Sequence, residues 1–415
     1  MIRPFGKTAP MTPPPDRTRD YPHVLIAGAG AAGLWCGIRL AQAGWPGDRI
    51  TLVDPDPKTA DDHTWSYWTR REIVPADFVH TRYTRVEVAS GGERRDLPTH
   101  PYRYESIRSS AFYAYAKQVL AKAGAAWREG SVVAVEEFGG RKVDVAVEYG
   151  GQRNWITVDR VLDGRPPRVD VERPGSANTL QHFGGWFVET DADAFDPALA
   201  TLMDFVPVDA GVGFFYVLPK GPREALLELA IFSRDVWPQA RYDDALAEYV
   251  RGRYGLGAGA YRVREREYGV IPMTDQPLWE DGSARVWKIG TAGGWVQPSS
   301  GYAFTRCARY ATEVVRRLRE GRREAPRPGA LEQVFNTVML AHSIAAPERA
   351  GRTFLELFER NGAPSTFAFL DWESGLADTL RLMWRSPRRE FTARALSAVG
   401  RLLTRGFGGS TPWSN

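Results

Sequence analysis

The chain has 415 residues, 43% of them apolar, with a net charge of +4 and two cysteines. This length exceeds one ordinary hydrophobic core, so we expect two subdomains. Cys36 and Cys307 are far apart with no further thiol nearby, which excludes a disulfide framework, a zinc site and a dithiol motif and fits a reducing cytoplasm. No apolar run reaches membrane-spanning length, and the proline-rich residues 1–20 are expected to form a disordered tail.

The first predicted unit is a strand followed by a glycine-rich turn. The run 23–27, apolar from Val24 on, predicts a buried parallel strand, and Gly28, Gly30 and Gly33 follow it at once. Gly28 permits the tight turn, and Gly30 lets a pyrophosphate approach the backbone. Gly33 lets the next helix pack closely on the strand. This spacing indicates a dinucleotide-binding site.

A helix over 31–43 and a second strand over 50–53 complete the unit. The unpaired N–H groups and the dipole at the start of the helix favour phosphate binding. Asp54 closes the second strand. A carboxylate there can accept hydrogen bonds from an adenosine ribose and disfavours a 2′-phosphate.

The middle of the chain alternates between predicted strands and one helix. Alternation and turn residues predict strands at 84–88, 132–135 and 160–163, a helix at 109–123, and a hairpin over 143–158 around Gly150 and Gly151. A second strand-rich region, 179 to about 266, includes runs at 186–190, 212–218 and 225–232. Such aromatic and aliphatic strands suit a sheet that walls a large apolar cavity.

A second glycine-rich turn follows the predicted strand 285–289. Its residues are Gly290, Thr291, Ala292 and Gly293, and a helix is expected to start near Gly301. In two-domain flavoproteins such a late turn brings backbone N–H groups to the flavin end of the cofactor. A simple strand-to-helix turn is the alternative. Together with the first turn, it favours FAD over NAD as the cofactor.

The last part of the chain, from residue 303, is predicted to be mostly helical and is basic. Residues 380–407 contain seven arginines and one glutamate, interleaved with apolar residues. This composition is typical of a helix that lies on an anionic bilayer, and an ordinary solvated helix face is the alternative. No nucleic-acid motif accompanies the charge, so we expect no nucleic-acid partner.

Several motifs resemble those of bacterial lycopene beta-cyclases. The segment 62–68 (Asp-His-Thr-Trp-Ser-Tyr-Trp) resembles the family's His-Thr-Trp-Ser segment. The resemblance covers roughly residues 22–390 in the right order, through 195–205, 215–219, 269–275, 290–294 and 298–304. Val206 stands where the family often has arginine, and Leu229 and Ala230 replace a more polar pair, so details of the substrate are expected to differ.

The resemblance implies redox-neutral ring closure at the ends of lycopene or a related linear carotene. A proton adds to a terminal double bond, an internal double bond attacks the cation, and a neighbouring proton is lost. Protonating an alkene needs a strong acid shielded from water. Glu228 matches the family's acidic residue, and its apolar neighbours would keep it protonated. An outward-facing Glu228 is the alternative, because strands alternate.

The resemblance also implies reduced FAD, reduced by NADPH or NADH, as an electrostatic stabiliser of the cation. Trp65, Tyr67 and Trp68 are candidates for cation–π contacts with the substrate, with core packing as the alternative. His63 is a candidate to orient an acid or touch the cofactor, although a lone histidine is more often structural.

These predictions combine into an α/β fold with a Rossmann-type FAD-binding domain, an interleaved antiparallel substrate sheet and a helical C-terminus. We place the FAD-binding domain at 21–170 and 267–325, the substrate sheet at 171–266, and the helical basic segment at 326–415. We expect a cytoplasmic protein, peripheral on the inner face of the cell membrane. Two other classes stay open: a flavin monooxygenase or prenyl-chain reductase of the same fold, and a non-catalytic prenyl or carotenoid carrier.

Overall fold

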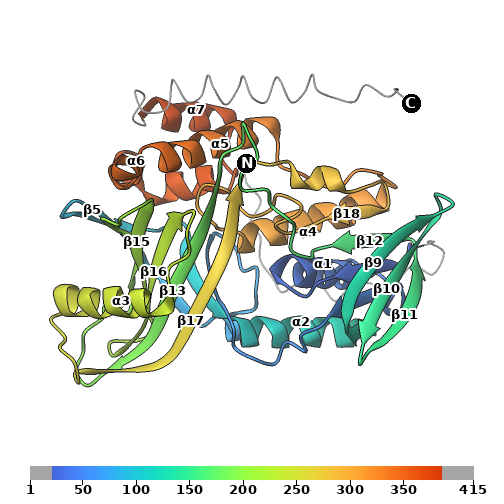
Figure 1. The fold of residues 1–415 in the computed structure, drawn as a ribbon, viewed down its shortest axis with the longest axis horizontal. Coiled ribbons are helices and arrows are strands. Elements are labelled where there is room, and N and C mark those ends of the chain that lie inside the picture. Colours follow the sequence, from blue (N-terminus) through green and yellow to red (C-terminus); the bar gives the residue numbers. More distant parts are fainter. Residues whose placement is uncertain (1–20, 386–415) are drawn as a thin grey trace, which may run out of the picture.

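The computed structural model describes residues 21–385, and a five-stranded parallel sheet forms the first of its two main layers (Figure 1). Along β1, Val24 and Ile26 face one core cluster and Leu25 and Ala27 face another. This alternation explains why the run is apolar throughout. In spatial order the strands are β18 (Val286–Lys288), β12 (Arg160–Asp163), β1 (Val24–Ala27), β2 (Ile50–Asp54) and β8 (Ala126–Glu129).

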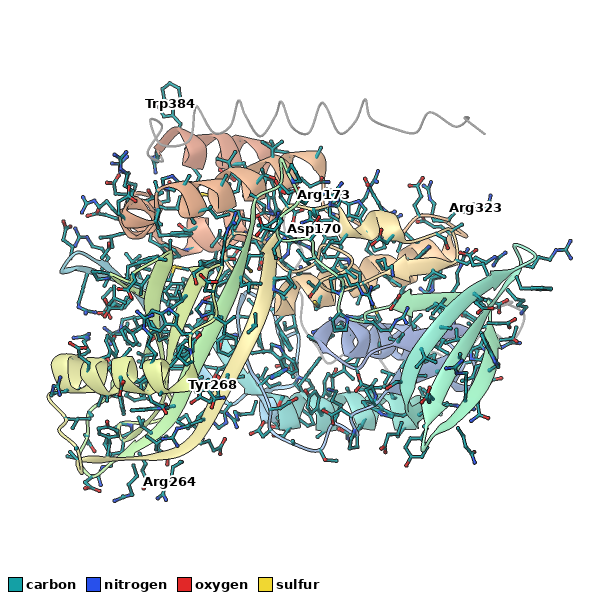
Figure 2. All side chains as sticks on the ribbon, viewed as in Figure 1. Asp170, Arg173, Arg264, Tyr268, Arg323 and Trp384 are labelled. Atoms are coloured by element: carbon teal, nitrogen blue, oxygen red, sulfur yellow. The ribbon has the colours of Figure 1, made fainter. Side chains whose placement is uncertain are left out.

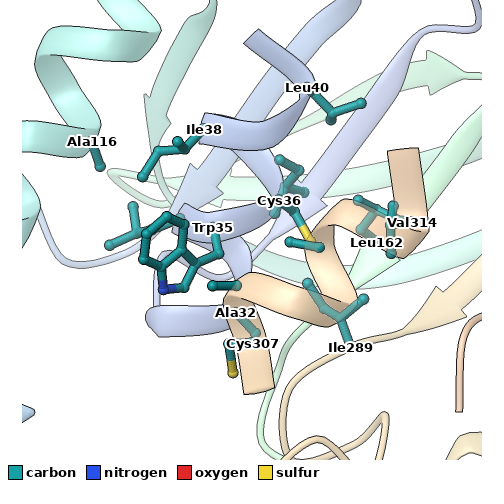
Figure 3. Close-up of a cluster of buried hydrophobic side chains, with 14 of the residues drawn as sticks. Ala32, Trp35, Cys36, Ile38, Leu40, Ala116, Leu162, Ile289, Cys307 and Val314 are labelled. Atoms are coloured by element: carbon teal, nitrogen blue, oxygen red, sulfur yellow. The ribbon is translucent and has the colours of Figure 1, made fainter. Parts of the chain in front are cut away.

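Helices cover one face of the parallel sheet and a three-stranded meander covers the other. Figure 3 shows the helical side, where Trp35 and Ile38 lie near Ala116 and Cys307. The helices are α1 (Ala31–Gln42), α2 (Ser109–Ala123) and α4 (Phe304–Arg319), and the meander consists of β9 (Ser131–Phe138), β10 (Lys142–Tyr149) and β11 (Gln152–Val158).

The second layer is a seven-stranded sheet in which the β14–β5 pair is parallel and the other pairs are antiparallel. It takes strands from outside 171–266, because β5, β6 and the end of β17 belong to it. The spatial order is β17 (Tyr261–Thr274), β13 (Asn178–Thr190), β16 (Glu224–Ser233), β15 (Val212–Pro219), β14 (Leu199–Val206), β5 (Arg85–Ser90) and β6 (Glu93–Pro98).

One face of this sheet packs on α3 (Gln239–Tyr254), and the other faces a second core cluster. A small sheet and the C-terminal helices complete that cluster, the helices lying at the top of Figure 1. The small sheet is β3 (Thr64–Thr69), β7 (Arg103–Arg108) and β4 (Thr81–Tyr83); the helices are α5 (Ala330–Ala345), α6 (Pro347–Leu370) and α7 (Leu376–Arg385). Short helices η1 (Gly47–Arg49), η2 (Ala76–Phe78) and η3 (Leu278–Asp281) lie in connections.

The predicted fold class is confirmed, and several predicted elements are found where expected. The helix predicted at 109–123 is α2, and the predicted hairpin joins β10 to β11 through two glycines with positive φ, 57° and 76°. The helix expected near Gly301 begins at Phe304. The predicted tail and the arginines beyond Arg385 lie outside the described residues.

Candidate active site

The first glycine-rich turn has the geometry that a bound pyrophosphate requires. A Cβ on Gly33 would lie 1.9 Å from the carbonyl oxygen of Gly28, so only glycine allows α1 to approach the turn this closely. Gly28 itself has a φ of +101°, which disfavours other residues. A Cβ on Gly30 would meet no atom within 4 Å, so the space before α1 is open.

Asp54 is fixed at the end of β2, beside this turn. Its carboxylate is buried and accepts N–H groups from Ala29 at 2.5 Å and Asp56 at 2.9 Å. Lys58 Nζ lies 3.7 Å from Asp54 Oδ1. A carboxylate has about four acceptor positions, so capacity remains for a ribose hydroxyl.

The second glycine-rich turn lies against the first. A Cβ on Gly290 would lie 3.1 Å from the Cβ of Ala32 in α1, and a Cβ on Gly293 would lie 2.7 Å from a backbone oxygen. Thr291 and Ala292 occupy the same turn, between β18 and α4. The two segments are far apart in sequence, and the fold brings them to one end of the parallel sheet.

Buried polar atoms without partners lie beyond this turn. Gly301 has a φ of +77°, and a Cβ there would lie 2.2 Å from Gln181 Oε1. Among residues 21–385, that oxygen and the buried Gln297 Nε2 have no hydrogen-bond partner. A buried polar group without a partner calls for an explanation, and a bound ligand is one. The described residues therefore fit a dinucleotide cofactor that runs from Asp54 past both turns.

Two glutamates meet on one face of the seven-stranded sheet. Gly185 of β13 is paired with Glu228 of β16 on one side and with Glu267 of β17 on the other. A Cβ on Gly185 would lie 3.2 Å from Glu267 Cγ and 3.5 Å from Glu228 Cβ. The missing side chain lets the two carboxyl groups come together, and they share a hydrogen bond.

This environment keeps protons on the pair. Burial, and next the charge of Glu267, raise the pKa of Glu228 well above its usual value. Burial raises the pKa of Glu267 to about 7, although the positive charge of Arg108 opposes the rise. Glu228 lies deep in the protein yet keeps some accessible surface, so unfilled space remains beside it. Near neutral pH the pair therefore holds at least one proton.

Arg108 lies close enough to the glutamates for its charge to act on Glu267. Its guanidinium lies 4.1 Å from the ring centre of Phe187 and donates to Asp61 at 2.5 Å and Glu265 at 2.7 Å. All four side chains also line a surface pocket of about 400 Å³. Phe187 and Glu265 are each two residues from the row of paired residues that contains the glutamates, so this pocket lies beside the pair.

An aromatic wall faces Glu228. Trp68 stacks on Phe367 of α6 with ring centres 4.6 Å apart, and it lies 4.4 Å from Tyr302. The hydroxyl of Tyr104 lies 2.5 Å from that of Tyr216 and 3.1 Å from that of Tyr302. Tyr216 is paired with Glu228 across β15 and β16. The wall thus offers π faces and hydroxyl dipoles beside an acid.

The structure divides the three predicted substrate aromatics between two cores. Strand β3 alternates, so Trp68 faces the wall while Trp65 and Tyr67 face the core beside the parallel sheet. There the rings of Trp65 and Tyr67 stack on the ring of Phe304, with ring centres 5.6 and 4.8 Å apart. Core packing is thus the observed environment of these two residues, and Trp68 remains the candidate for substrate contact.

His63 lies at the surface, and its contacts are local. Its side chain is 60% exposed, and its ring forms a hydrogen bond with the carbonyl of Asp62. The centre of its ring lies 5.9 Å from that of Trp65. Its backbone N–H donates to Ser109. None of these contacts reaches Glu228, so the geometry gives His63 no part in orienting that acid.

Glu267, Tyr104 and Tyr216 were absent from the sequence-based site. Each lies in an ordinary alternating strand, and their convergence depends on pairing register between distant segments. The consecutive glycines Gly184 and Gly185, directly before the predicted run 186–190, were the available signal. A glycine there often marks a close approach of neighbouring groups.

The fold and the two glycine-rich turns define a class, the two-domain proteins with a Rossmann-type nucleotide-binding domain. The chain belongs to the lycopene cyclase family, since the model of that family, described as lycopene cyclase protein, matches residues 23–394. A comparison with curated proteins gave no match. Among residues 21–385, no helix is both long and apolar enough to cross a membrane.

Solved structures with this fold include several flavoenzymes. A geranylgeranyl bacteriochlorophyll reductase-like protein from Thermoplasma acidophilum has a TM-score of 0.61 and 12% identity, covering 91% of this chain and 99% of its own. The flavin-dependent brominase Bmp2 has a TM-score of 0.53 and 15% identity, with coverages of 93% and 98%. A mutant of halogenase PltM in complex with FAD has a TM-score of 0.56 and 13% identity, covering 95% of this chain and 93% of its own. At these identities the likeness establishes the fold alone.

Proposed function

We propose that this protein is an FAD-dependent lycopene cyclase that converts linear ends of lycopene, or a related linear carotene, into beta-ionone rings. The observation that carries the proposal is the carboxyl pair of Glu228 and Glu267, buried beside an aromatic wall. An alkene is a weak base, and a protonated carboxyl shielded from water is a suitable donor for it. Family membership supports the same chemistry.

In this mechanism the pair supplies and recovers one proton. Glu228 transfers its proton to the terminal double bond of the carotene, leaving a carboxylate and a tertiary cation. The internal double bond attacks the cation and closes a six-membered ring. The attack moves the positive charge to the adjacent ring carbon, and the ring carbon that has formed the new bond then loses its proton, which returns to the pair. Substrate and product have the same composition, and no electrons are consumed.

The cation needs stabilisation by groups that do not attack it. The ring faces of Trp68 and Tyr302 are candidates, since aromatic quadrupoles attract positive charge. Gly28, Gly30, Gly33 and Asp54 would hold the adenosine and pyrophosphate of FAD, and the second turn with Gly301 its flavin end. Bound reduced flavin, with NADPH or NADH as reductant, would supply electron density near the cation.

The test uses purified full-length protein, lycopene in liposomes and FAD reduced by dithionite, with no nicotinamide. We expect ring formation with an unchanged carotene mass. Pigment chromatography detects the ring, and mass spectrometry measures the mass. A product heavier by a hydrogen pair would indicate a prenyl-chain reductase, and a product with added oxygen a monooxygenase. Carotene that is bound but unchanged, by a protein without FAD, would indicate a carrier.

We further propose that the protein takes its substrate from the inner face of the cell membrane through α7 and the basic segment after it. Trp384 is 69% exposed and projects from α7 at the top of Figure 2. Arg381 and Arg385 of the same helix are also exposed. A carotene is practically insoluble in water, and an aromatic residue flanked by arginines suits an anionic interface.

Charge reversal tests this docking surface. Arg385→Glu should weaken binding to liposomes containing anionic lipid at least roughly fivefold, because each arginine near such a surface contributes about 1 kcal/mol. Arg264→Glu changes the net charge equally at the opposite end of the molecule in Figure 2 and should leave binding unchanged. Equal affinities of the two variants in a co-sedimentation assay would contradict the docking proposal.

A further inference from the structure

A buried cation lies beside the glutamate pair, on Arg108 at the end of β7. Its side chain is 9% exposed, and its guanidinium donates to Asp61 at 2.5 Å and to Glu265 at 2.7 Å. The same group lies 4.1 Å from the ring centre of Phe187. Two carboxylates and one aromatic face therefore hold a full positive charge at a defined place.

The strand register places this charge nearer to Glu267 than to Glu228. Glu265 and Glu267 are two residues apart in β17, so their side chains share a face and their Cα atoms are about 7 Å apart. They lie opposite Phe187 and Gly185 of β13. Glu228 is on the other side of β13, in β16, so two interstrand spacings, about 10 Å, separate its backbone from that of Glu267. The guanidinium, bonded to Glu265, thus approaches the pair from the β17 side.

The charge of Arg108 acts unequally on the two carboxyl groups. Burial raises the pKa of Glu267, and the next largest effect is the charge of Arg108, which lowers it. Burial and the charge of Glu267 raise the pKa of Glu228, and among the described residues no cation opposes them. A single proton is therefore held more strongly by Glu228, and a single negative charge is better placed on Glu267.

Two carboxylates share Arg108 and act against it. Asp61, which precedes β3, and Glu265 both raise the pKa of Glu267. Because both of them bond to the guanidinium, removing Arg108 would leave two unbalanced negative charges beside Glu267.

Further charged groups near the pair occur as ion pairs. They are Lys220 with Glu224, Arg264 with Glu189 and, on the other face of β17, Arg266 with Asp243. Burial, and next the charge of Lys220, lower the pKa of His80, which is therefore neutral near pH 7. Beside Glu228, burial raises the pKa of Tyr302, so this hydroxyl is also neutral.

We propose that Arg108 is a positioning residue that keeps the negative charge of the singly protonated pair on Glu267 and the proton on Glu228. Its contacts on three sides hold the guanidinium at the β17 side of the pair, so this preference is built into the folded chain. The proton thus stays on the carboxyl that is paired with Tyr216 of the aromatic wall. This role rests on the proposed function for its use in cyclisation, but the location of the proton does not depend on the substrate.

Removing the charge of Arg108 should raise the pH at which Glu267 titrates. The measurement uses the Glu228→Gln background, in which Glu267 is the one acid left of the pair and its titration is uncoupled. A nearby opposite charge lowers the pKa of a carboxyl by about 1 to 3 units, so Arg108→Gln should raise the Glu267 midpoint by at least about one pH unit. Arg108→Lys keeps the charge, although not the planar fork, and should remove most of that rise.

The same substitution should affect Glu228 less. In the Glu267→Gln background Glu228 is the acid that remains, and it lies two strands from β17. Arg108→Gln should therefore move the midpoint of Glu228 by a smaller amount than that of Glu267.

The experiment is an infrared pH titration of the full-length protein in D2O. The carboxyl bands that disappear in Glu228→Gln and in Glu267→Gln identify the two acids. Arg264→Gln is the matched control, because Arg264 lines the same pocket and its loss removes an equal charge. Its side chain is 58% exposed and pairs with Glu189, so solvent screens it and both midpoints should stay in place.

Equal Glu267 midpoints in Arg108→Gln and Arg264→Gln would overturn the inference, and so would equal shifts of Glu228 and Glu267. An Arg108→Lys midpoint as high as that of Arg108→Gln would also overturn it, since the shift would then come from altered packing and not from lost charge. If Arg108→Gln does not fold, Glu265→Gln decides. It removes an exposed anion that neutralises Arg108, so the Glu267 midpoint should fall, and an unchanged midpoint overturns the inference.

These midpoints need no carotene, so the inference and the proposed function fail separately. The expected shifts in a protein that does not close rings would uphold the role of Arg108 and reject the proposed function. If cyclisation is observed, Arg108→Gln should lower kcat by up to about tenfold. Part of the proton then resides on Glu267, and one pH unit corresponds to a tenfold change in the proton distribution.

Discussion

Glu228→Gln should lower kcat for cyclisation by about 100- to 10,000-fold, the usual contribution of a positioned general acid. Glutamine keeps the size of the side chain and its capacity for hydrogen bonds, but it carries no transferable proton. The site is partly accessible and already contains a neutral carboxyl, so the fold should tolerate the change. Initial rates of ring formation, with flavin content and thermal unfolding measured in parallel, test this expectation.

Glu267→Gln is the matched control, since it makes the same chemical change on the neighbouring strand. It leaves the proton of Glu228 in place but removes the charge that helps to raise the pKa of Glu228. A general acid works only while protonated, so wild-type activity should fall as the pH rises through the pKa of Glu228, which burial and the charge of Glu267 hold well above its usual value. In Glu267→Gln this alkaline limb should move to lower pH, because Glu228 then ionises more easily.

The two outcomes separate the roles of the pair. If Glu228→Gln keeps near wild-type turnover while Glu267→Gln loses it, the donor is Glu267 and the assignment must be exchanged. If both variants turn over normally, the carboxyl pair is not the source of the proton. An alkaline limb at the same pH in wild type and Glu267→Gln would also contradict the mechanism.

The sequence predicts the local geometry of the backbone better than it predicts which distant side chains meet in the folded protein. The strand–turn–helix unit at Gly28 depends on residues close together in the chain, and so does the helix at 109–123. Both were found as predicted, because backbone sterics and apolar periodicity act over a few residues. The partner of Glu228, in contrast, lies beyond α3, and its alignment depends on a bulge between Phe187 and Val188. No local pattern encodes such a register.

The aromatic segment shows the same limit. Alternation along β3 requires Trp65 and Tyr67 to share one face and Trp68 the other. Both faces are covered here, by Phe304 on one side and Phe367 on the other, so apolar character alone does not identify the substrate side. The distinction comes from tertiary packing. For His63, exposure followed from the polar turn in which it lies, where its ring bonds to the adjacent carbonyl.

Valine substitutions at two glycines of the same turn should have opposite effects. Gly30→Val should abolish flavin retention while changing the unfolding free energy of the apoprotein by less than about 1 kcal/mol. Gly30 has φ −71° and ψ 179°, which any residue adopts, and no atom lies within 4 Å of its Cβ position. The added side chain therefore fills only the space assigned to the pyrophosphate.

Gly33→Val should instead destabilise the fold by about 3 kcal/mol or more, because overpacking forces the backbone to shift. Its Cβ would lie 1.9 Å from the carbonyl oxygen of Gly28, a distance that requires α1 to move away from β1. Flavin absorbance per protein and chemical denaturation of the flavin-free forms measure both effects. Wild-type flavin content in Gly30→Val would place the pyrophosphate elsewhere. An unchanged stability in Gly33→Val would mean that α1 can retreat without cost, so that the close approach of the helix to the turn is not what holds this end of the domain.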